Sequence, residues 1–230
     1  MSDLTDLIAA YGEHLAQYDR WFSDCMERFS DRIFCAAGCA GCCRALFDIS
    51  LLDAALLQRG LHGLTPAEQT RVRERSGAIL VRLQEHWPDF SHPYTLNHRP
   101  EDHWEVPEED ATPCPFLDDT GRCLAYAFRP ATCRLHGLPN VDRGGEIFQA
   151  QGCSLNFAGA RALEEAGLQW DFHAAFLAEA RLYRSFAEAL LGSPEVQADT
   201  FIAAVPFIDF TALGASGRRG KVDLIPRDPD

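Results

Sequence analysis

Four of the nine cysteines in this chain lie close together, in the segment Cys35-Ala-Ala-Gly-Cys39-Ala-Gly-Cys42-Cys43. Four more follow at wider spacing, and they are Cys114, Cys123, Cys133 and Cys153. A hydrophobic core does not need thiols at this density, whereas thiolates are ligands of zinc and of iron–sulfur clusters. The sequence therefore predicts that these eight cysteines hold a metal ion or an iron–sulfur cluster.

The spacing of the cysteines limits the kind of site. Two residues separate Cys39 from Cys42, which lets two thiolates turn back onto one centre, and Gly38 and Gly41 permit the backbone conformations that such a turn needs. The downstream cysteines do not repeat this spacing as in an ordinary zinc finger, and neither common ferredoxin spacing is present. Our first hypothesis places Cys39 and Cys42 in one centre with two of the four downstream cysteines.

Eight thiolates exceed the needs of one tetrahedral site, so two arrangements stay open. The protein holds either two metal centres, or one four-thiolate cluster beside thiols that exchange or undergo redox chemistry. The adjacent pair Cys42 and Cys43 bears on this choice, because neighbouring side chains diverge and reach one centre only if the chain bends. The ninth cysteine, Cys25, falls on the apolar stripe of a predicted helix and is expected to be a small buried hydrophobic residue.

Several basic residues accompany the predicted ligands. Guanidinium groups at these places either offset thiolate charge and donate hydrogen bonds to a cluster, bind an anionic substrate, or pair with surface acids. His136 lies three residues after Cys133, and we expect it to be hydrogen-bonded near the metal rather than to bind it. The arginines concerned are Arg44, Arg122, Arg129 and Arg134.

The composition narrows the class of protein. A chain of 230 residues with 47% apolar content can bury one core, so we expect a single domain. The net charge of -13 argues against nucleic acid as a partner, because phosphate contacts require a basic face. The start of the chain is acidic and no run of about 18 apolar residues occurs, so we expect no secretory signal, no membrane insertion and a cytoplasmic protein. In a reducing cytoplasm, clustered thiols are more often ligands than disulfides.

Local signals predict a mainly helical fold with little or no β-structure. Apolar residues recur at spacings of three and four from Leu4 to Ile33, which indicates one long amphipathic helix. Many prolines and glycines between residues 88 and 152 indicate an irregular region that a metal would organise. The predicted organisation is a helix over residues 1–34, a cysteine-cluster metal-binding region over 35–157, a helical region over 158–216 and a flexible tail over 217–230, all in one compact domain.

The ends of the shorter helices carry their own signals. Ser50-Leu-Leu-Asp53 resembles a capping box and predicts a short helix that ends at Gly60. Thr65-Pro66-Ala67-Glu68 predicts a second helix start, and that helix should run to about Trp87. Regular helix is expected to resume near Ala158, with an apolar stripe that Gly192 ends.

The combined motifs resemble the CxxCxxCC cysteine-cluster proteins of the YkgJ type over roughly residues 35 to 153. The motifs are Cys35-x3-Cys39-x2-Cys42-Cys43-Arg44, Cys114-Pro-Phe-Leu, Asp119-Thr-Gly-Arg-Cys123, Arg129-Pro130-x2-Cys133-Arg134 and Cys153. The resemblance implies a domain that chelates zinc or iron through eight cysteines, without implying a reaction. A distant enzymatic relative is the flagellin lysine N-methylase, which is associated with an iron–sulfur cluster, but this chain is shorter and has no glycine-rich strand-to-helix motif for a methyl donor.

Two classes of function follow from these observations. The first is a protein that carries an iron–sulfur cluster, with [4Fe-4S] favoured, and that transfers electrons with a protein redox partner or supports a redox reaction. The second is a non-catalytic module in which zinc or mononuclear iron folds the middle segment and the helices bind a partner. A protein lysine N-methyltransferase is a further alternative that rests on the resemblance alone. The sequence identifies no small-molecule substrate.

Overall fold

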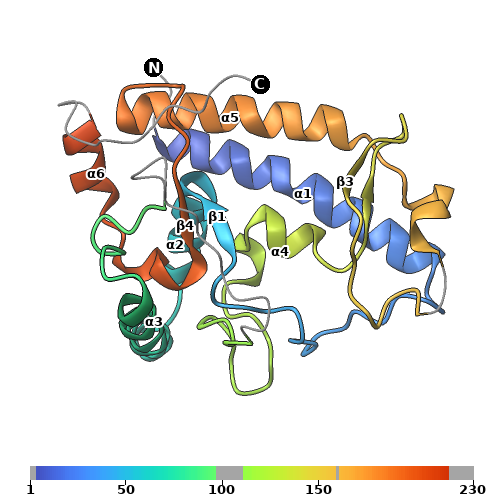
Figure 1. Ribbon diagram of the computed structural model, residues 1–230, viewed down its shortest axis with the longest axis horizontal. Helices are drawn as coiled ribbons and strands as arrows, with labels where there is room; N and C mark the ends of the chain where they lie inside the picture. The colour runs from blue at the N-terminus through green and yellow to red at the C-terminus, as the bar shows by residue number, and fades with distance from the viewer. Residues whose placement is uncertain (1–3, 97–110, 159–160, 218–230) are drawn as a thin grey trace.

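The structure is a computed structural model that describes residues 4–96, 111–158 and 161–217 (Figure 1). Within these residues the protein is mainly helical, as predicted, and none of the helices is long and apolar enough to cross a membrane. Most of the predicted tail, residues 218–230, lies outside the described residues. The α-helices are α1 (Leu4–Arg28), α2 (Leu51–His62), α3 (Pro66–His86), α4 (Ala131–Leu135), α5 (Phe172–Leu191) and α6 (Phe210–Gly217).

The remaining regular elements are short. The 3-10 turns are η1 (Tyr126–Phe128), η2 (Ala162–Glu164), η3 (Ala166–Leu168) and η4 (Ile202–Phe207). β1 (Asp48–Ser50) pairs with β4 (Asp199–Phe201), and β2 (Asn140–Val141) pairs with β3 (Ile147–Gln149), both antiparallel. The first of these pairs ties the end of the cysteine-rich segment to the C-terminal part of the fold.

The long helix α1 packs along α5, and Figure 1 shows the two helices side by side. Its apolar stripe buries Tyr11, Leu15 and Tyr18, as the spacing predicts. The helix ends at Arg28, however, and does not continue to Ile33 as expected. The chain instead turns, because the carbonyl of Arg32 accepts a hydrogen bond from the backbone N–H of Phe157 at 2.8 Å. Ile33 is still buried, so its apolar character serves the core without extending the helix.

The helix α2 begins where its cap predicts but ends later. The side chain of Ser50 accepts a hydrogen bond from the backbone N–H of Asp53. Gly60 lies inside the helix, which continues to His62, so the prediction that Gly60 ends it is wrong. A Cβ atom at Gly60 would lie 2.7 Å from the ring of Phe128. The glycine is therefore there for close packing against η1 rather than to stop the helix.

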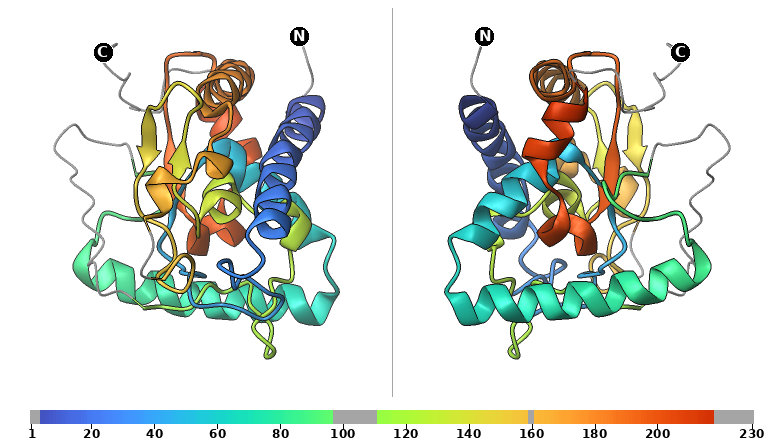
Figure 2. Two further views of the ribbon diagram at one scale, coloured as in Figure 1. Left: turned by 90° about the vertical axis from the view of Figure 1, so that its right-hand side faces the viewer. Right: turned by 90° about the vertical axis from the view of Figure 1, so that its left-hand side faces the viewer.

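The helix α3 lies across the direction of α1 and α5 (Figure 2). The capping box at its start is complete, since Thr65 and Glu68 each hydrogen-bond the other's backbone, and Pro66 occupies the first turn. The helix ends at His86, close to the predicted position. These signals act within one helical turn, which explains why the sequence alone locates both ends.

The C-terminal helix begins later than expected. Between Ala158 and α5 the described residues form only the two turns η2 and η3, and regular helix begins at Phe172. The end is as predicted, because Gly192 adopts a left-handed conformation with φ of 80°. The rings of Trp21 and Phe172 meet edge to face at 4.9 Å, which attaches the start of α5 to α1.

Candidate metal centre

The first four cysteines lie on a loop that follows α1 and contains two tight turns. The backbone N–H of Cys39 donates to the carbonyl of Ala36, and that of Cys43 donates to Ala40, both at 3.0 Å. Gly38 has a positive φ of 88°, which agrees with its expected role, whereas Gly41 does not belong to the glycines with positive φ. A Cβ atom at Gly121 would lie 2.7 Å from the carbonyl oxygen of Gly38. This loop therefore packs directly against the segment that carries Cys123.

Cys114 and Cys123 are brought together by a hairpin-like turn. The backbone N–H of Cys114 donates to the carbonyl of Cys43 at 3.0 Å, which joins this turn to the first loop. An isolated bridge pairs Leu117 with Cys123, and the N–H of Leu124 donates to the carbonyl of Phe116 at 2.8 Å. Cys43, Cys114 and Cys123 are thus connected through the backbone.

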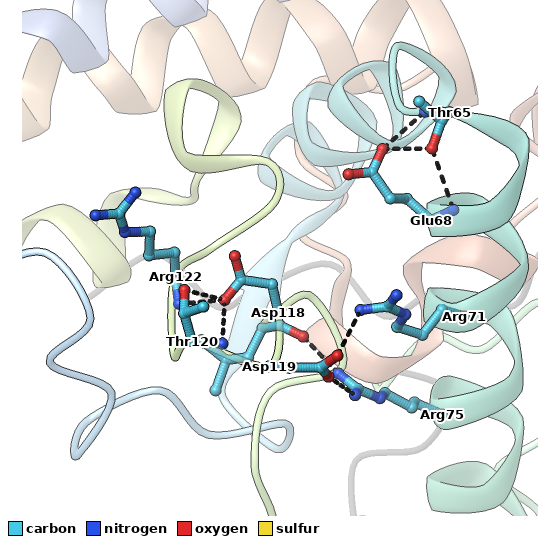
Figure 3. Close-up of polar contacts among 9 residues, drawn as sticks. Thr65, Glu68, Arg71, Arg75, Asp118, Asp119, Thr120 and Arg122 are labelled. Atoms are coloured by element: carbon cyan, nitrogen blue, oxygen red, sulfur yellow. Dashed lines mark hydrogen bonds and ion pairs between the residues drawn. The ribbon is translucent and has the colours of Figure 1, made fainter.

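The tip of that turn is held by two aspartates, as Figure 3 shows. One carboxylate oxygen of Asp118 accepts hydrogen bonds from the N–H and hydroxyl of Thr120 and from the N–H of Arg122, at 2.7 to 2.9 Å. Asp119 pairs with Arg71 and Arg75 of α3 at 3.5 and 3.2 Å. The first set of bonds shapes the turn, and the second attaches it to a long helix.

Cys133 lies on α4, which is attached to α1 and α2. The backbone N–H of Ala131 donates to a carboxylate oxygen of Asp53 on α2 at 3.0 Å. Arg129 and the buried Arg134 both pair with Asp19 on α1, the first at 2.6 Å. These arginines therefore orient the cysteine-bearing helix. Of the three roles expected for them, they have the third, pairing with an acidic residue, and Arg134 does so while buried.

Cys35 and Cys153 are joined through Asn156, a residue that the sequence analysis missed. The side-chain amide of Asn156 donates to the carbonyl of Gly137 at 2.9 Å and lies 3.3 Å from the sulfur of Cys35. Its oxygen accepts a bond from the N–H of Phe34 at 2.9 Å, and the N–H of Cys153 donates to Gly137 at 3.1 Å. No spacing rule indicates such a residue, because the partners of its side chain come from two segments distant in the sequence.

The eight thiols form two sets of four when they are grouped by their electrostatic neighbours. Cys35 is influenced by Cys153, Cys39 and Cys42, and Cys43 is influenced by Cys114, Cys133 and Cys123. We call the first group the outer set and the second group the inner set. The tandem pair lies at their boundary, because contact with Cys43 is the largest cause of the raised pKa of Cys42 and contact with Cys42 lowers the pKa of Cys43. In this grouping Cys39 and Cys42 fall with Cys35 and Cys153, and the interaction of Cys42 with Cys43 links the two sets.

The two sets differ in their exposure to solvent. Burial raises the pKa of Cys114 to about 12, and burial together with the neighbouring thiols Cys114 and Cys123 raises the pKa of Cys133 well above its ordinary value. Cys39 in the outer set is exposed. Thiols in apolar surroundings stay protonated unless a cation compensates the thiolate charge. Cys114 and Cys133 therefore favour a bound cation that compensates the thiolate charge, whereas the contact with Cys42 lowers the pKa of Cys43 in the same set.

The chemistry of the donors fits the predicted cofactors, although the ligands are not preformed. Four thiolates suit both a structural zinc site and a [4Fe-4S] cluster. In the part of the chain that the structure describes, no three His, Cys, Asp or Glu side chains stand at the mutual distances of a metal site. The sets are therefore defined by packing and electrostatics, and not by coordination geometry.

The remaining predicted residues have ordinary environments. Arg44 donates to the carbonyl of Ala111 at 3.0 Å. His136 packs against Phe47 with ring centroids 5.5 Å apart, and burial followed by the charge of Arg44 lowers its pKa. Cys25 is buried, as predicted, and burial raises its pKa to about 11.

A helical protein in which eight cysteines from distant segments gather into two thiol-rich sets belongs to the class of cysteine-cluster metal-binding proteins. Residues 34–153 match the family model CxxCxxCC, described as "Putative zinc- or iron-chelating domain". The match covers more than half of the chain, and the protein is a member of this family, as the motifs predict. No curated protein and no solved structure is significantly similar to it.

Proposed function

We propose that this protein binds metal through both cysteine sets and that a [4Fe-4S] cluster with a redox or electron-transfer role occupies the inner set. The observation that carries this proposal is the grouping of eight thiols into four and four. Each set has the number of thiolates that one [4Fe-4S] cluster or one tetrahedral zinc ion takes. The proposed ligands are Cys43, Cys114, Cys123 and Cys133 for the inner set, and Cys35, Cys39, Cys42 and Cys153 for the outer set.

The surroundings of the inner set favour the cluster there. Cys114, Cys123 and Cys133 pack against the main hydrophobic core, and hydrogen bonding and solvent exposure are among the factors that set a cluster's potential. The charge of Arg129 lowers the pKa of Cys123 and Cys133, against the larger effect of burial. A nearby fixed cation of this kind also favours the more negative, reduced state of a cluster.

The outer set is the proposed place of contact with a protein redox partner. Phe34 and Leu155 flank Cys35 and Cys153 and expose 59% and 57% of their surface. Exposed apolar residues beside a redox site are suited to a transient protein contact. Nucleic acid is not proposed as a partner because of the charge of -13, and the cytoplasm is proposed as the compartment because it keeps thiols reduced.

The alternative is a non-catalytic module that binds zinc or mononuclear iron. It is favoured by the low content of regular structure in the segments that the cysteines join, since a metal would hold these segments together. A lysine N-methyltransferase activity stays an alternative by resemblance only, and no feature of the described residues adds support to it.

The test is analysis of metal and acid-labile sulfide, with absorption and electron paramagnetic resonance spectra, on protein purified without oxygen. Iron with matching sulfide and a signal on reduction would support the cluster. Zinc without sulfide would overturn the redox proposal and favour the structural module. Cys133→Ser should abolish the cluster spectrum, whereas Cys25→Ser is the matched control and should leave it unchanged.

A further inference from the structure

A chain of side-chain hydrogen bonds connects α1, α2 and α5. The hydroxyl of Tyr11 lies 2.8 Å from a carboxylate oxygen of Asp53 and 2.9 Å from a carboxylate oxygen of Glu179. The other oxygen of Glu179 accepts a bond from the hydroxyl of Tyr18 at 2.6 Å. Tyr11 and Tyr18 are fully buried, whereas 22% of the Glu179 side chain is exposed.

The two bonds of Tyr11 raise a question of proton number. A tyrosine hydroxyl carries one hydrogen and can donate one full hydrogen bond, yet both of its contacts have the length of a full bond. If both carboxyl groups were ionised, the one hydrogen of the Tyr11 hydroxyl would have to serve two carboxylate acceptors. A second proton on one carboxyl group removes this conflict, because that group then donates to the tyrosine oxygen.

The surrounding donors indicate which carboxyl group carries the proton. Asp53 also accepts bonds from the N–H of Ala131 at 3.0 Å and from the hydroxyl of Ser50 at 3.0 Å, and such donors favour its ionised form. Among the described residues, the side chain of Glu179 has two hydrogen-bond partners. It accepts from the hydroxyl of Tyr18, and its other oxygen contacts the hydroxyl of Tyr11. The bonds then run in one direction, from Tyr18 to Glu179 to Tyr11 to Asp53.

The charged and titratable groups around this chain leave the proton in place. His14 on α1 lies 4.0 Å from Glu179, and burial lowers its pKa and so favours its neutral form. Arg134 on α4 interacts with Asp53 and Tyr11, but it is paired with Asp19. Cys133 on the same helix is influenced by the charge of Asp53. A cysteine thiol brings no positive charge that would stabilise an ionised Glu179.

We propose that Glu179 and Tyr11 form a partly buried proton-binding site, in which Glu179 is protonated at neutral pH and donates to the Tyr11 hydroxyl. Burial raises the pKa of Glu179, and burial followed by the charge of Glu179 raises the pKa of Asp53 to about 6, so both carboxyl groups bind a proton more readily than in the unfolded chain. The proton keeps one negative charge rather than two inside the helical layer. It leaves Asp53 free to accept from Ala131 at the start of α4, and the proposal does not depend on a metal.

The sign of the pH effect follows from linkage. A carboxyl group whose pKa is raised on folding binds its proton more tightly in the folded state than in the unfolded chain. Its stabilising effect is complete below the ordinary pKa of glutamate and is lost as the pH rises through the raised value. Folding stability should therefore decrease with rising pH over that interval because of Glu179.

The test compares Glu179→Gln with Glu188→Gln, a matched change at an exposed position of the same helix. Infrared spectra of the intact protein at about pH 7 should contain the carbonyl band of a protonated carboxyl group, which Glu179→Gln removes and Glu188→Gln retains. The urea midpoint, measured from about pH 5 to about pH 8, should decrease with pH in the wild type and in Glu188→Gln, and this slope should be smaller in Glu179→Gln, where Asp53 alone contributes to it.

Two results would overturn the proposal. One is the absence of a protonated carboxyl band from the wild-type protein, a measurement that does not require any variant to fold. The other is an unchanged pH slope in Glu179→Gln. Tyr11→Phe provides a second variant, and it should shift the titration of the remaining band because the bridging hydroxyl is gone. An unshifted titration would also count against the proposal.

Discussion

The backbone N–H of Cys114 donates a 3.0 Å hydrogen bond to the carbonyl of Cys43. This bond joins the last cysteine of the first motif to the first cysteine of the downstream group. The charges that influence Cys43 include those of Cys114, Cys123 and Cys133, and the charge of its neighbour Cys42 influences Cys35. This difference is the basis for proposing that the adjacent cysteines belong to different sets.

The two sets should bind metal separately. The double variant Cys114→Ser/Cys133→Ser should lose the inner metal, and Cys39→Ser/Cys153→Ser should lose the outer metal, so each should retain about half of the wild-type content if each set takes one centre. Inductively coupled plasma mass spectrometry on freshly purified protein measures this. A complete loss in the outer double variant, with its helical circular dichroism preserved, would contradict two independent sets.

Gly121 should be more sensitive to substitution than Gly145. Both have a positive φ, so alanine at either position costs about 1–2 kcal/mol from backbone strain. A Cβ atom at Gly121 also meets the carbonyl of Gly38, whereas none of the described atoms lies within 4 Å of one at Gly145. Gly121→Ala should therefore lower stability by about 1–3 kcal/mol more than Gly145→Ala and speed metal release to a chelator.

Asn156 should be needed for the outer set. Asn156→Ala leaves the N–H of Phe34 without its acceptor and the carbonyl of Gly137 without one donor, and we expect a loss of about 1–3 kcal/mol in the free energy of unfolding. Chelator-induced release of the outer metal should become faster, as followed by a colorimetric indicator. The exposed Gln151→Ala is the control, and an equal effect there would refute a special role for Asn156.

Thr65 should affect stability without affecting metal. Thr65→Ala removes the capping box of α3, which costs about 1 kcal/mol, while the cysteine sets keep their attachments through Arg71 and Arg75. Thermal unfolding measures the stability, and metal analysis should give the wild-type value. A reduced metal content would show that the start of α3 is coupled to the turn of residues 118–122 more strongly than its contacts indicate.

The sequence predicted those parts of the structure that depend on nearby residues. The caps at Ser50 and Thr65 and the left-handed end at Gly192 are all present, because their hydrogen bonds and backbone preferences act within a few residues. The eight cysteines and the family were also evident from motif spacing alone. Gly60 was misinterpreted as a helix end, since its close contact with Phe128 lies outside its own helix.

Only the tertiary structure decided how the cysteines are divided. Spacing grouped Cys39 with Cys42, whereas the link between Cys35 and the segment of Cys153 is made by Asn156, which lies 121 residues from Cys35 in the chain. The buried contact of Tyr11 with Asp53 and Glu179 likewise requires three helices to pack. A local pattern determines the conformation of its own segment, whereas such neighbours are chosen by the packing of the whole core.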